Sequence, residues 1–160
     1  MDIRTLDNTA DRDQVARLFE RAADYVTLET GQPPNSGTAD DFFADRPPTV
    51  AAEDTQHFGI FEQDHLLGIV GVLFGYPDPT DHYIGMMLLA PAARGLGVGA
   101  KALSHVTSLA RTRGARRQLI AVLEANPKGR AFWEREGFVF NKTFPAGEDG
   151  HIRHRLMRQI

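Results

Sequence analysis

The chain has 160 residues, of which 42% are hydrophobic and 24% charged, and its formal net charge is −3. This length and composition are typical of one globular domain, so we expect a single domain over residues 1–160. The absence of cysteine excludes disulfides, thiolate metal sites and a cysteine nucleophile. Because no apolar run reaches membrane-spanning length and the N-terminal residues lack a signal-like apolar region, we expect a cytoplasmic protein that has no membrane partner.

The charges are distributed unevenly along the chain. Residues 92–130 carry eight Lys or Arg and one acidic residue, whereas residues 29–54 carry six acidic residues and one basic residue. The basic half suits a polyanionic cofactor, and the acidic segment either suits a cationic substrate or is a solvated face. Basic residues do not alternate with aromatic ones as they do in nucleic-acid binders, so we expect no nucleic-acid partner.

The N-terminal third is predicted to form a strand and two helices. Residues 3–6 alternate as a short strand does, and residues 15–26 place their apolar side chains on one face of a helix. Asp11 is the expected cap of this helix and Gly31 its expected end. A short helix is predicted over residues 38–44, between two loops rich in proline.

The remaining sequence predicts alternating strands and helices. Gln63-Asp64 is typical of a hairpin turn between two strands, and Asn126-Pro127 is typical of the capped start of a helix. The expected elements are strands over 57–61, 66–74 and 82–89, a helix ending at Gly114, a strand over 118–123, a helix from Pro127 to Gly137, and strands over 138–144 and 151–157.

A glycine-rich turn, Arg94-Gly95-Leu96-Gly97-Val98-Gly99, lies between the strand over 82–89 and the next helix. A strand, a glycine turn and a helix start in this order form a nest of backbone N–H groups that binds phosphate. The turn also fits a dinucleotide fingerprint, but the nearest later acidic residue, Glu124, lies 29 residues beyond Gly95, where about 20 are expected. The Walker pattern fails because Ala100 precedes Lys101, and a plain tight turn remains the structural alternative.

Two motifs give the sequence a resemblance to a known family. The spacing Arg-x-x-Gly-x-Gly resembles the acetyl-CoA pyrophosphate loop of the GNAT superfamily of N-acyltransferases. About 30 residues later, Asn126, the segment 130–134 and Gly137-Phe138 resemble the family pattern Asn-x-x-Ala-x-x-Leu-Tyr-x-x-x-Gly-Phe, although Gly129 replaces the usual alanine. On these motifs and the order of elements, the chain is identified as a member of this superfamily.

The resemblance implies an α/β fold with a mixed, mainly antiparallel seven-stranded sheet and about four flanking helices. It further implies that the sheet splays between its fourth and fifth strands, over residues 82–89 and 118–123, and that CoA enters the split. Main-chain groups of Met87, Leu88 and Leu89 would bind the pantetheine arm. The pyrophosphate would lie against Arg94, Gly95, Leu96, Gly97, Val98, Gly99 and Ala100. Asn126 would lie beside the pantetheine or act only as a helix cap, and no metal ion is implied.

Trp133 departs from the family pattern, in which a tyrosine at this position protonates the leaving thiolate. An indole N–H donates a hydrogen bond but is not an acid at physiological pH, so Trp133 cannot transfer a proton. The proton of the acceptor amine would be taken near the start of the strand over 82–89, where Tyr83 is either a pocket wall or the base and Asp81 could act through water. Alternation predicts that Tyr83 shares a face with Met87, opposite His82.

The resemblance therefore predicts an enzyme that moves an acetyl group from the cosubstrate acetyl-CoA to a primary amine by direct attack in a ternary complex. The acidic segment favours a small cationic amine. The alternative is a non-catalytic module that binds or senses acyl-CoA, which Trp133 and the lack of an obvious base would both fit. The six histidines have no metal-ligand spacing, and the sequence leaves open whether the protein forms a homodimer.

Overall fold

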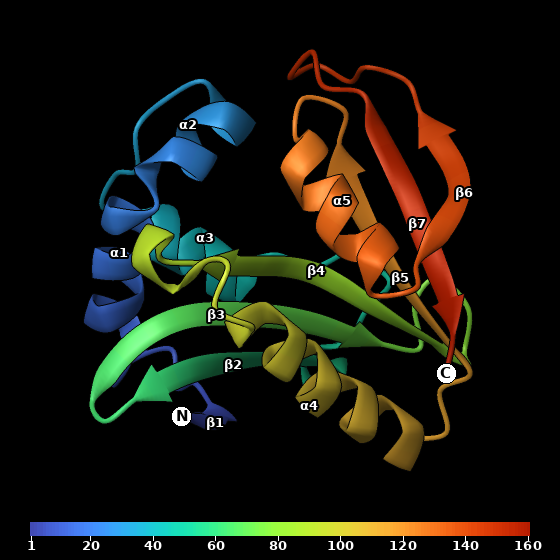
Figure 1. Cartoon of the computed structure of the whole chain (residues 1–160), viewed down its shortest axis with the longest axis horizontal. Coiled ribbons are helices and arrows are strands. Elements are labelled where there is room, and N and C mark those ends of the chain that lie inside the picture. Colours follow the sequence, from blue (N-terminus) through green and yellow to red (C-terminus); the bar gives the residue numbers. More distant parts are fainter.

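The computed structural model describes residues 1–160, which form one seven-stranded sheet flanked by five α-helices (Figure 1). The strand order is β1-β2-β3-β4-β5-β7-β6, and every neighbouring pair is antiparallel except β4 and β5. In chain order the elements are β1 (Asp2–Thr5), α1 (Arg12–Arg21), α2 (Ala23–Thr30), α3 (Thr38–Ala44), β2 (Thr55–Glu62), β3 (His65–Phe74), β4 (Asp81–Leu89), α4 (Val98–Thr112), β5 (Arg117–Leu123), α5 (Pro127–Arg135), β6 (Val139–Phe144) and β7 (Arg153–Gln159).

Two apolar clusters hold the helices against opposite faces of the sheet. On one face, Leu18 and Phe19 of α1 pack with Phe42 of α3 and with side chains of β3 and β4. On the other face, α4 and α5 pack against β2 to β5 and β7, with Leu103 and Trp133 among the buried side chains. Burial of this apolar surface is the main stabilising contribution to the fold. None of the helices combines the length and the apolar character needed to span a bilayer.

The sheet splits between its two parallel strands. β4 and β5 pair only from Asp81 opposite Arg117 to Ile84 opposite Ile120, and beyond this point the strands diverge (Figure 1). The backbone of residues 85–89 therefore has no strand partner on the β5 side. The splay implied by the family resemblance is confirmed.

A β-bulge at Gly85 corrects the predicted faces of β4. Met86 pairs with Gly71 of β3, but Ile84 pairs with the next residue, Val72, so Gly85 is an extra residue in β4. The bulge interrupts the strict alternation of side chains. Met86 accordingly packs toward α1 to α3 and Met87 toward α4. Tyr83 shares its face with Met86, so the prediction that it shares a face with Met87 is wrong.

The predicted N-terminal helix is two helices in the structure. The chain bends at Ala22, whose backbone lies at φ −100° and ψ 30°, and α2 then ends as predicted at Gly31, in the left-handed conformation. Asp11 does not cap α1 with its side chain, because both carboxylate oxygens accept hydrogen bonds from Arg4, at 2.9 and 2.7 Å. The bend lets α1 pack on the sheet while α2 reaches toward the split (Figure 1).

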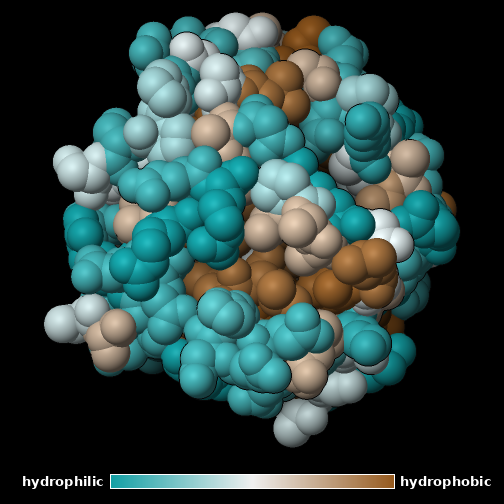
Figure 2. Space-filling model, turned by 60° about the vertical axis from the view of Figure 1, so that its left-hand side comes forward, coloured by the Kyte–Doolittle hydropathy of each residue, from teal (hydrophilic) through white to brown (hydrophobic).

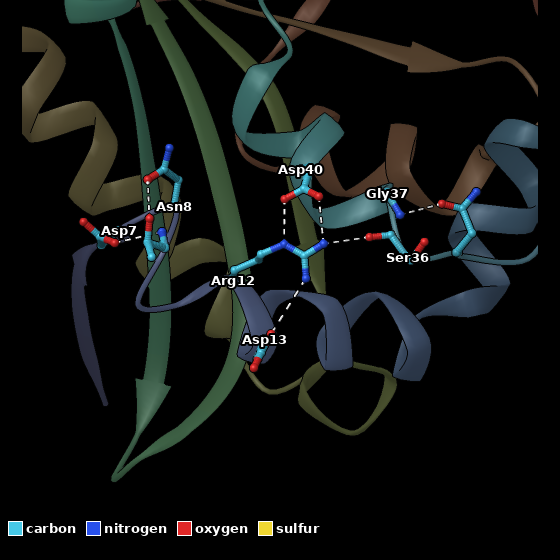
Figure 3. A network of polar contacts seen from close by, with 9 residues as sticks. Asp7, Asn8, Arg12, Asp13, Ser36, Gly37 and Asp40 are labelled. Carbon is cyan, nitrogen blue, oxygen red and sulfur yellow. Dashed lines mark hydrogen bonds and ion pairs between the residues drawn. The ribbon is translucent and has the colours of Figure 1, made fainter.

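An ion pair on the surface holds α3 beside α1. The guanidinium of Arg12 donates to both carboxylate oxygens of Asp40 at 2.7 Å and to the backbone carbonyl of Ser36 at 2.8 Å (Figure 3). Because the pair is exposed, it contributes little stability, on the order of 1 kcal/mol or less. It links α1 to the loop before α3 and to Asp40 within α3, the helix that carries Phe42 over the sheet.

Candidate active site

A cavity with a volume of about 940 Å³ lies in the split between β4 and β5. α5 and the glycine-rich turn also line it, together with residues of α2. Apolar side chains gather in a hollow bordered by hydrophilic ones on the face shown in Figure 2. The expected cofactor-binding residues that line the cavity are Met87, Leu88, Leu89, Arg94, Gly95, Gly97, Gly99, Ala100, Asn126 and Trp133.

Two residues of the glycine turn direct their side chains elsewhere. Leu96 is 71% exposed, and Val98 is buried in a small cluster with Ala102 and Ile60. Neither of them lines the cavity. Any contact of these two residues with a ligand in the cavity would therefore come from the main chain.

The glycine turn leaves the start of α4 open to an anion. Gly95 and Gly97 both have φ of 77°, a left-handed conformation that glycine adopts without strain. α4 has no side-chain cap and no acidic residue in its first turn, and its first internal hydrogen bond runs from the Lys101 N–H to the Gly97 carbonyl. The preceding N–H groups lack helical partners and lie at the positive end of the helix dipole. Such a start of a helix binds phosphate.

Arg94 is held by a carboxylate that sequence analysis did not identify. Its guanidinium forms a bidentate ion pair with Asp24 of α2, at 2.5 and 3.0 Å, and donates to the Leu89 carbonyl at 3.1 Å. The hydrogen bonds from Arg94 lower the pKa of Asp24. An anion bound at the glycine turn would compete with Asp24 for Arg94.

Asn126 lines the cavity and also caps α5. Its side-chain oxygen accepts a hydrogen bond from the Gly129 N–H at 3.0 Å. A Cβ atom at Gly129 would lie 2.5 Å from the side-chain nitrogen of Asn126. The glycine that replaces the usual alanine of the family pattern therefore makes room for the folded-back amide.

Trp133 is a core residue that also borders the cavity. Its side chain is 6% exposed, and its ring packs edge-on against Phe132 and Phe138, with centroids 4.9 and 5.2 Å away. Trp133, which stands where the family pattern has a tyrosine, thus packs in the core and also lines the cavity in the split.

A second cavity of about 370 Å³ lies between the end of α3 and strands β2, β3 and β4. It shares only Gly85 and Met86, at the bulge, with the lining of the larger cavity. Tyr83 lies in its wall, with its ring 5.5 Å from that of Tyr76. Burial, and then the proximity of Tyr76, raises the pKa of Tyr83, so the phenol stays protonated at neutral pH.

Asp81, which was expected to act through water beside Tyr83, lines neither cavity. Its side chain has no exposed surface, and both oxygens accept hydrogen bonds from the guanidinium of Arg117 at 2.7 Å. Both oxygens are therefore already occupied by the guanidinium. We therefore assign Asp81 a structural role.

The mouth of the split carries charged groups from both sides. Burial raises the pKa of Glu29 on α2, and the positive charge of Arg153 on β7 offsets only part of this rise. Arg153 also forms an ion pair with Asp149, at 2.5 Å, in the turn that faces α2 across the gap (Figure 1). Glu29 belongs to the acidic segment identified in the sequence, but its position opposite β7 arises from the bend at Ala22.

Solved acetyltransferase structures share this fold at low sequence identity. An acetyltransferase from Thermus thermophilus is 20% identical with a TM-score of 0.78, over 99% of this chain and 96% of that one. An aminoglycoside 6'-N-acetyltransferase complexed with coenzyme A is 14% identical with a TM-score of 0.75, over 99% and 97%. The ribosomal-protein-S18-alanine N-acetyltransferase from Escherichia coli is 15% identical with a TM-score of 0.73, over 99% and 93%.

Among curated proteins, none matches the chain in sequence. The sequence profile described as "Acetyltransferase (GNAT) family" does match, over residues 14–138, which is more than half of the chain. This range contains the split, the glycine turn and the motif around Asn126. The chain therefore belongs to the acetyltransferase (GNAT) family.

Proposed function

We propose that the protein transfers an acetyl group from acetyl-CoA to the primary amine of a small cationic molecule, by direct attack within a ternary complex. The observation that carries this proposal is the meeting of the two cavities at Gly85 and Met86. One cavity has the N–H groups and the open strand edge that a CoA molecule requires. The other approaches the same point from the α3 side and suits the acceptor.

Each part of the larger cavity has a chemical counterpart in acetyl-CoA. The start of α4 would hold the pyrophosphate, with Arg94 beside it. The unpaired edge of residues 85–89 would accept the pantetheine arm as an added strand. The thioester would then lie near the bulge, where the cavities meet.

The reaction forms a C–N bond and breaks the C–S bond of the thioester. The amine must first give up a proton, because an alkylammonium has a pKa near 10 and no lone pair for the attack. The departing thiolate leaves with the C–S electron pair and takes a proton from water, since Trp133 has none to give. The indole N–H remains a hydrogen-bond donor that would stabilise the thiolate.

The charge and the size of the smaller cavity favour a compact, charged acceptor. Asp45 and Arg46 both line the smaller cavity, and Glu29 lies near Asp45, so two carboxylates and one guanidinium border the approach of the acceptor. Carboxylates raise the local concentration of cations. A cavity of about 370 Å³ is small, which favours a compact amine over a long peptide.

The test is a screen for CoA thiol release with acetyl-CoA and a panel of compact amines, peptides and aminoglycosides. The proposal predicts steady release with at least one compact amine, and initial-velocity lines that intersect when both substrates are varied. Parallel lines would contradict direct attack. Binding of acetyl-CoA without release across the panel would instead favour the non-catalytic acyl-CoA-binding module, which the tryptophan at position 133 also fits.

A further inference from the structure

We propose that His57 is the general base that takes the proton of the acceptor amine, a role that rests on the proposed acetyl transfer. His57 lies on β2 and lines the smaller cavity, together with Tyr83 and Met86. Its side chain is half-buried and forms no hydrogen bond with another side chain. The sequence placed it only in a strand.

The strand register points His57 toward the meeting point of the cavities. His57 pairs with Gly71 of β3, and Gly71 pairs with Met86 of β4, so the three residues form one row across the sheet. Two strand spacings separate His57 from Met86, about 10 Å between backbones. A histidine side chain and a small amine together fit across this distance.

Gly71 keeps the space between His57 and the bulge open. A Cβ atom at this position would lie 3.3 Å from the Phe42 ring and 3.4 Å from the His57 ring, on the face covered by α3. Any larger side chain would fill the floor of the cavity beside the imidazole. The glycine therefore gives a ligand in the cavity access to His57.

The surroundings orient the His57 ring. The rings of Phe42 and Phe43 pack edge-on against it, with centroids 4.7 and 5.3 Å away. The backbone of Phe42 lies close enough to the ring to offset part of the effect of burial on the pKa of His57. Burial lowers the pKa of His57 below its ordinary 6.5, so the ring is neutral at neutral pH.

The other ionisable groups around the cavity do not compete for this role. Asp45 and Arg46, at the end of α3, and Tyr76 and Tyr83, around the start of β4, face the same space as His57. The two charged groups suit the binding of a polar acceptor, and Asp45 partly offsets the effect of burial on the pKa of His57. Tyr83 stays protonated, and Glu29 is not part of the cavity wall.

The proton balance of the step is simple. The ammonium of the acceptor first passes one proton to a ring nitrogen of His57, which frees the lone pair that attacks the acetyl carbon. The thiolate leaves with the C–S electrons, and the nitrogen, now bonded to the acetyl carbon, loses its second proton to the solvent. The imidazolium then releases its proton to water, which restores the neutral ring. The thiolate gains a proton from the solvent.

The test compares His57→Gln with wild type by the pH dependence of kcat/KM. Wild type is expected to lose activity as the pH falls through a limb below 6.5, because His57 becomes protonated. His57→Gln should lower kcat by about 100-fold or more and remove this limb, with acetyl-CoA affinity unchanged. His105→Gln, on the exposed side of α4, is the matched control and should leave rate and limb unchanged.

Imidazole rescue of His57→Ala guards against a variant that is merely misfolded, since added imidazole should restore activity only if a base is missing. An unchanged kcat and an unchanged acidic limb in folded His57→Gln would overturn the role of His57 while leaving the acetyl transfer intact. Loss of activity in His57→Ala without rescue, together with an intact limb in His57→Gln, would do the same. Absence of thiol release from wild type with any amine would overturn the proposed function itself, and the role of His57 with it.

Discussion

Asp81 and Arg117 pair the first residues of β4 and β5, at the closed end of the split. Replacing Asp81 with Asn leaves the guanidinium without its buried partner, and we expect the free energy of unfolding to fall by about 3 kcal/mol. Asp78→Asn is the matched control, because Asp78 contacts the same guanidinium at 3.0 Å but is 67% exposed, and it should cost less than about 1 kcal/mol. Chemical denaturation measures both. A fall in kcat without a loss of stability in Asp81→Asn would restore Asp81 as a base.

His82 gives the folded protein a dependence on pH. The ring is fully buried against Phe74 and Gln118, and its second nitrogen has no hydrogen-bond partner. Burial, and then the charge of Arg113, lowers the pKa of His82 from 6.5 to about 4. Below pH 6.5 His82 binds a proton in the unfolded chain, whereas the buried ring of the folded chain stays neutral down to about pH 4. The contribution of His82 to the free energy of unfolding is therefore fully present above pH 6.5 and decreases as the pH falls toward 4.

We expect the free energy of unfolding to fall by an amount on the order of 3 kcal/mol between pH 6.5 and 4 because of His82, at about 1.4 kcal/mol per pH unit. Denaturation curves at several pH values measure it, and His82→Gln should show a shallower dependence than wild type over this range. Identical slopes in the two proteins would show that His82 binds its proton equally well in the folded and unfolded states.

At the scale of elements, α2 and the glycine turn are joined by the pair of Asp24 and Arg94. Both side chains are partly exposed, so the pair adds little stability. Asp24→Asn would free Arg94 and remove a negative charge from the phosphate site, and we expect acetyl-CoA to bind about threefold more tightly, with a larger dependence on salt. Titration calorimetry is the measurement. Weaker binding in this variant would mean that Asp24 positions Arg94 for the pyrophosphate.

Local patterns predicted most elements, and contacts between elements explain what they missed. The helix cap at Asn126, the hairpin turn at Gln63-Asp64 and the glycine turn are short-range features, and all appear in the structure. The bulge at Gly85 exists only through pairing with β3, so alternation along β4 could not reveal it. It also changed the neighbours of Tyr83.

The bend at Ala22 was hidden for a different reason. Ala22 is buried and continues the apolar stripe of α1, so periodicity cannot distinguish one bent helix pair from one straight helix. The ion pair of Asp24 with Arg94 joins residues 70 positions apart, and no sequence spacing encodes it. The glycine turn could therefore be predicted from the sequence, because it is one short segment. The parts of the site that depend on the bulge at Gly85 and on the bend at Ala22 could not.

At the scale of the whole molecule, the acidic segment contributes Asp45 to the wall of the smaller cavity and Glu29 close to Asp45. If Glu29 and Asp45 attract the acceptor, the KM of a cationic amine should rise with ionic strength, and Glu29→Gln should raise it about fivefold at low salt. Steady-state kinetics measures this, with a neutral amine as the comparison. A KM that ignores both salt and the substitution would show that the acidic segment is only a solvated surface.

The central claim is that the split and the glycine turn hold acetyl-CoA, and calorimetric titration of Gly97→Asp tests it most directly. No atom lies within 4 Å of a Cβ at Gly97, and aspartate tolerates the left-handed conformation and caps helices, so the variant should fold. Its carboxylate would occupy the phosphate site, and we expect binding at least about 100-fold weaker than wild type. Gly97→Asn, equal in shape and neutral, should lose less than about tenfold. Wild-type affinity in folded Gly97→Asp would contradict the claim.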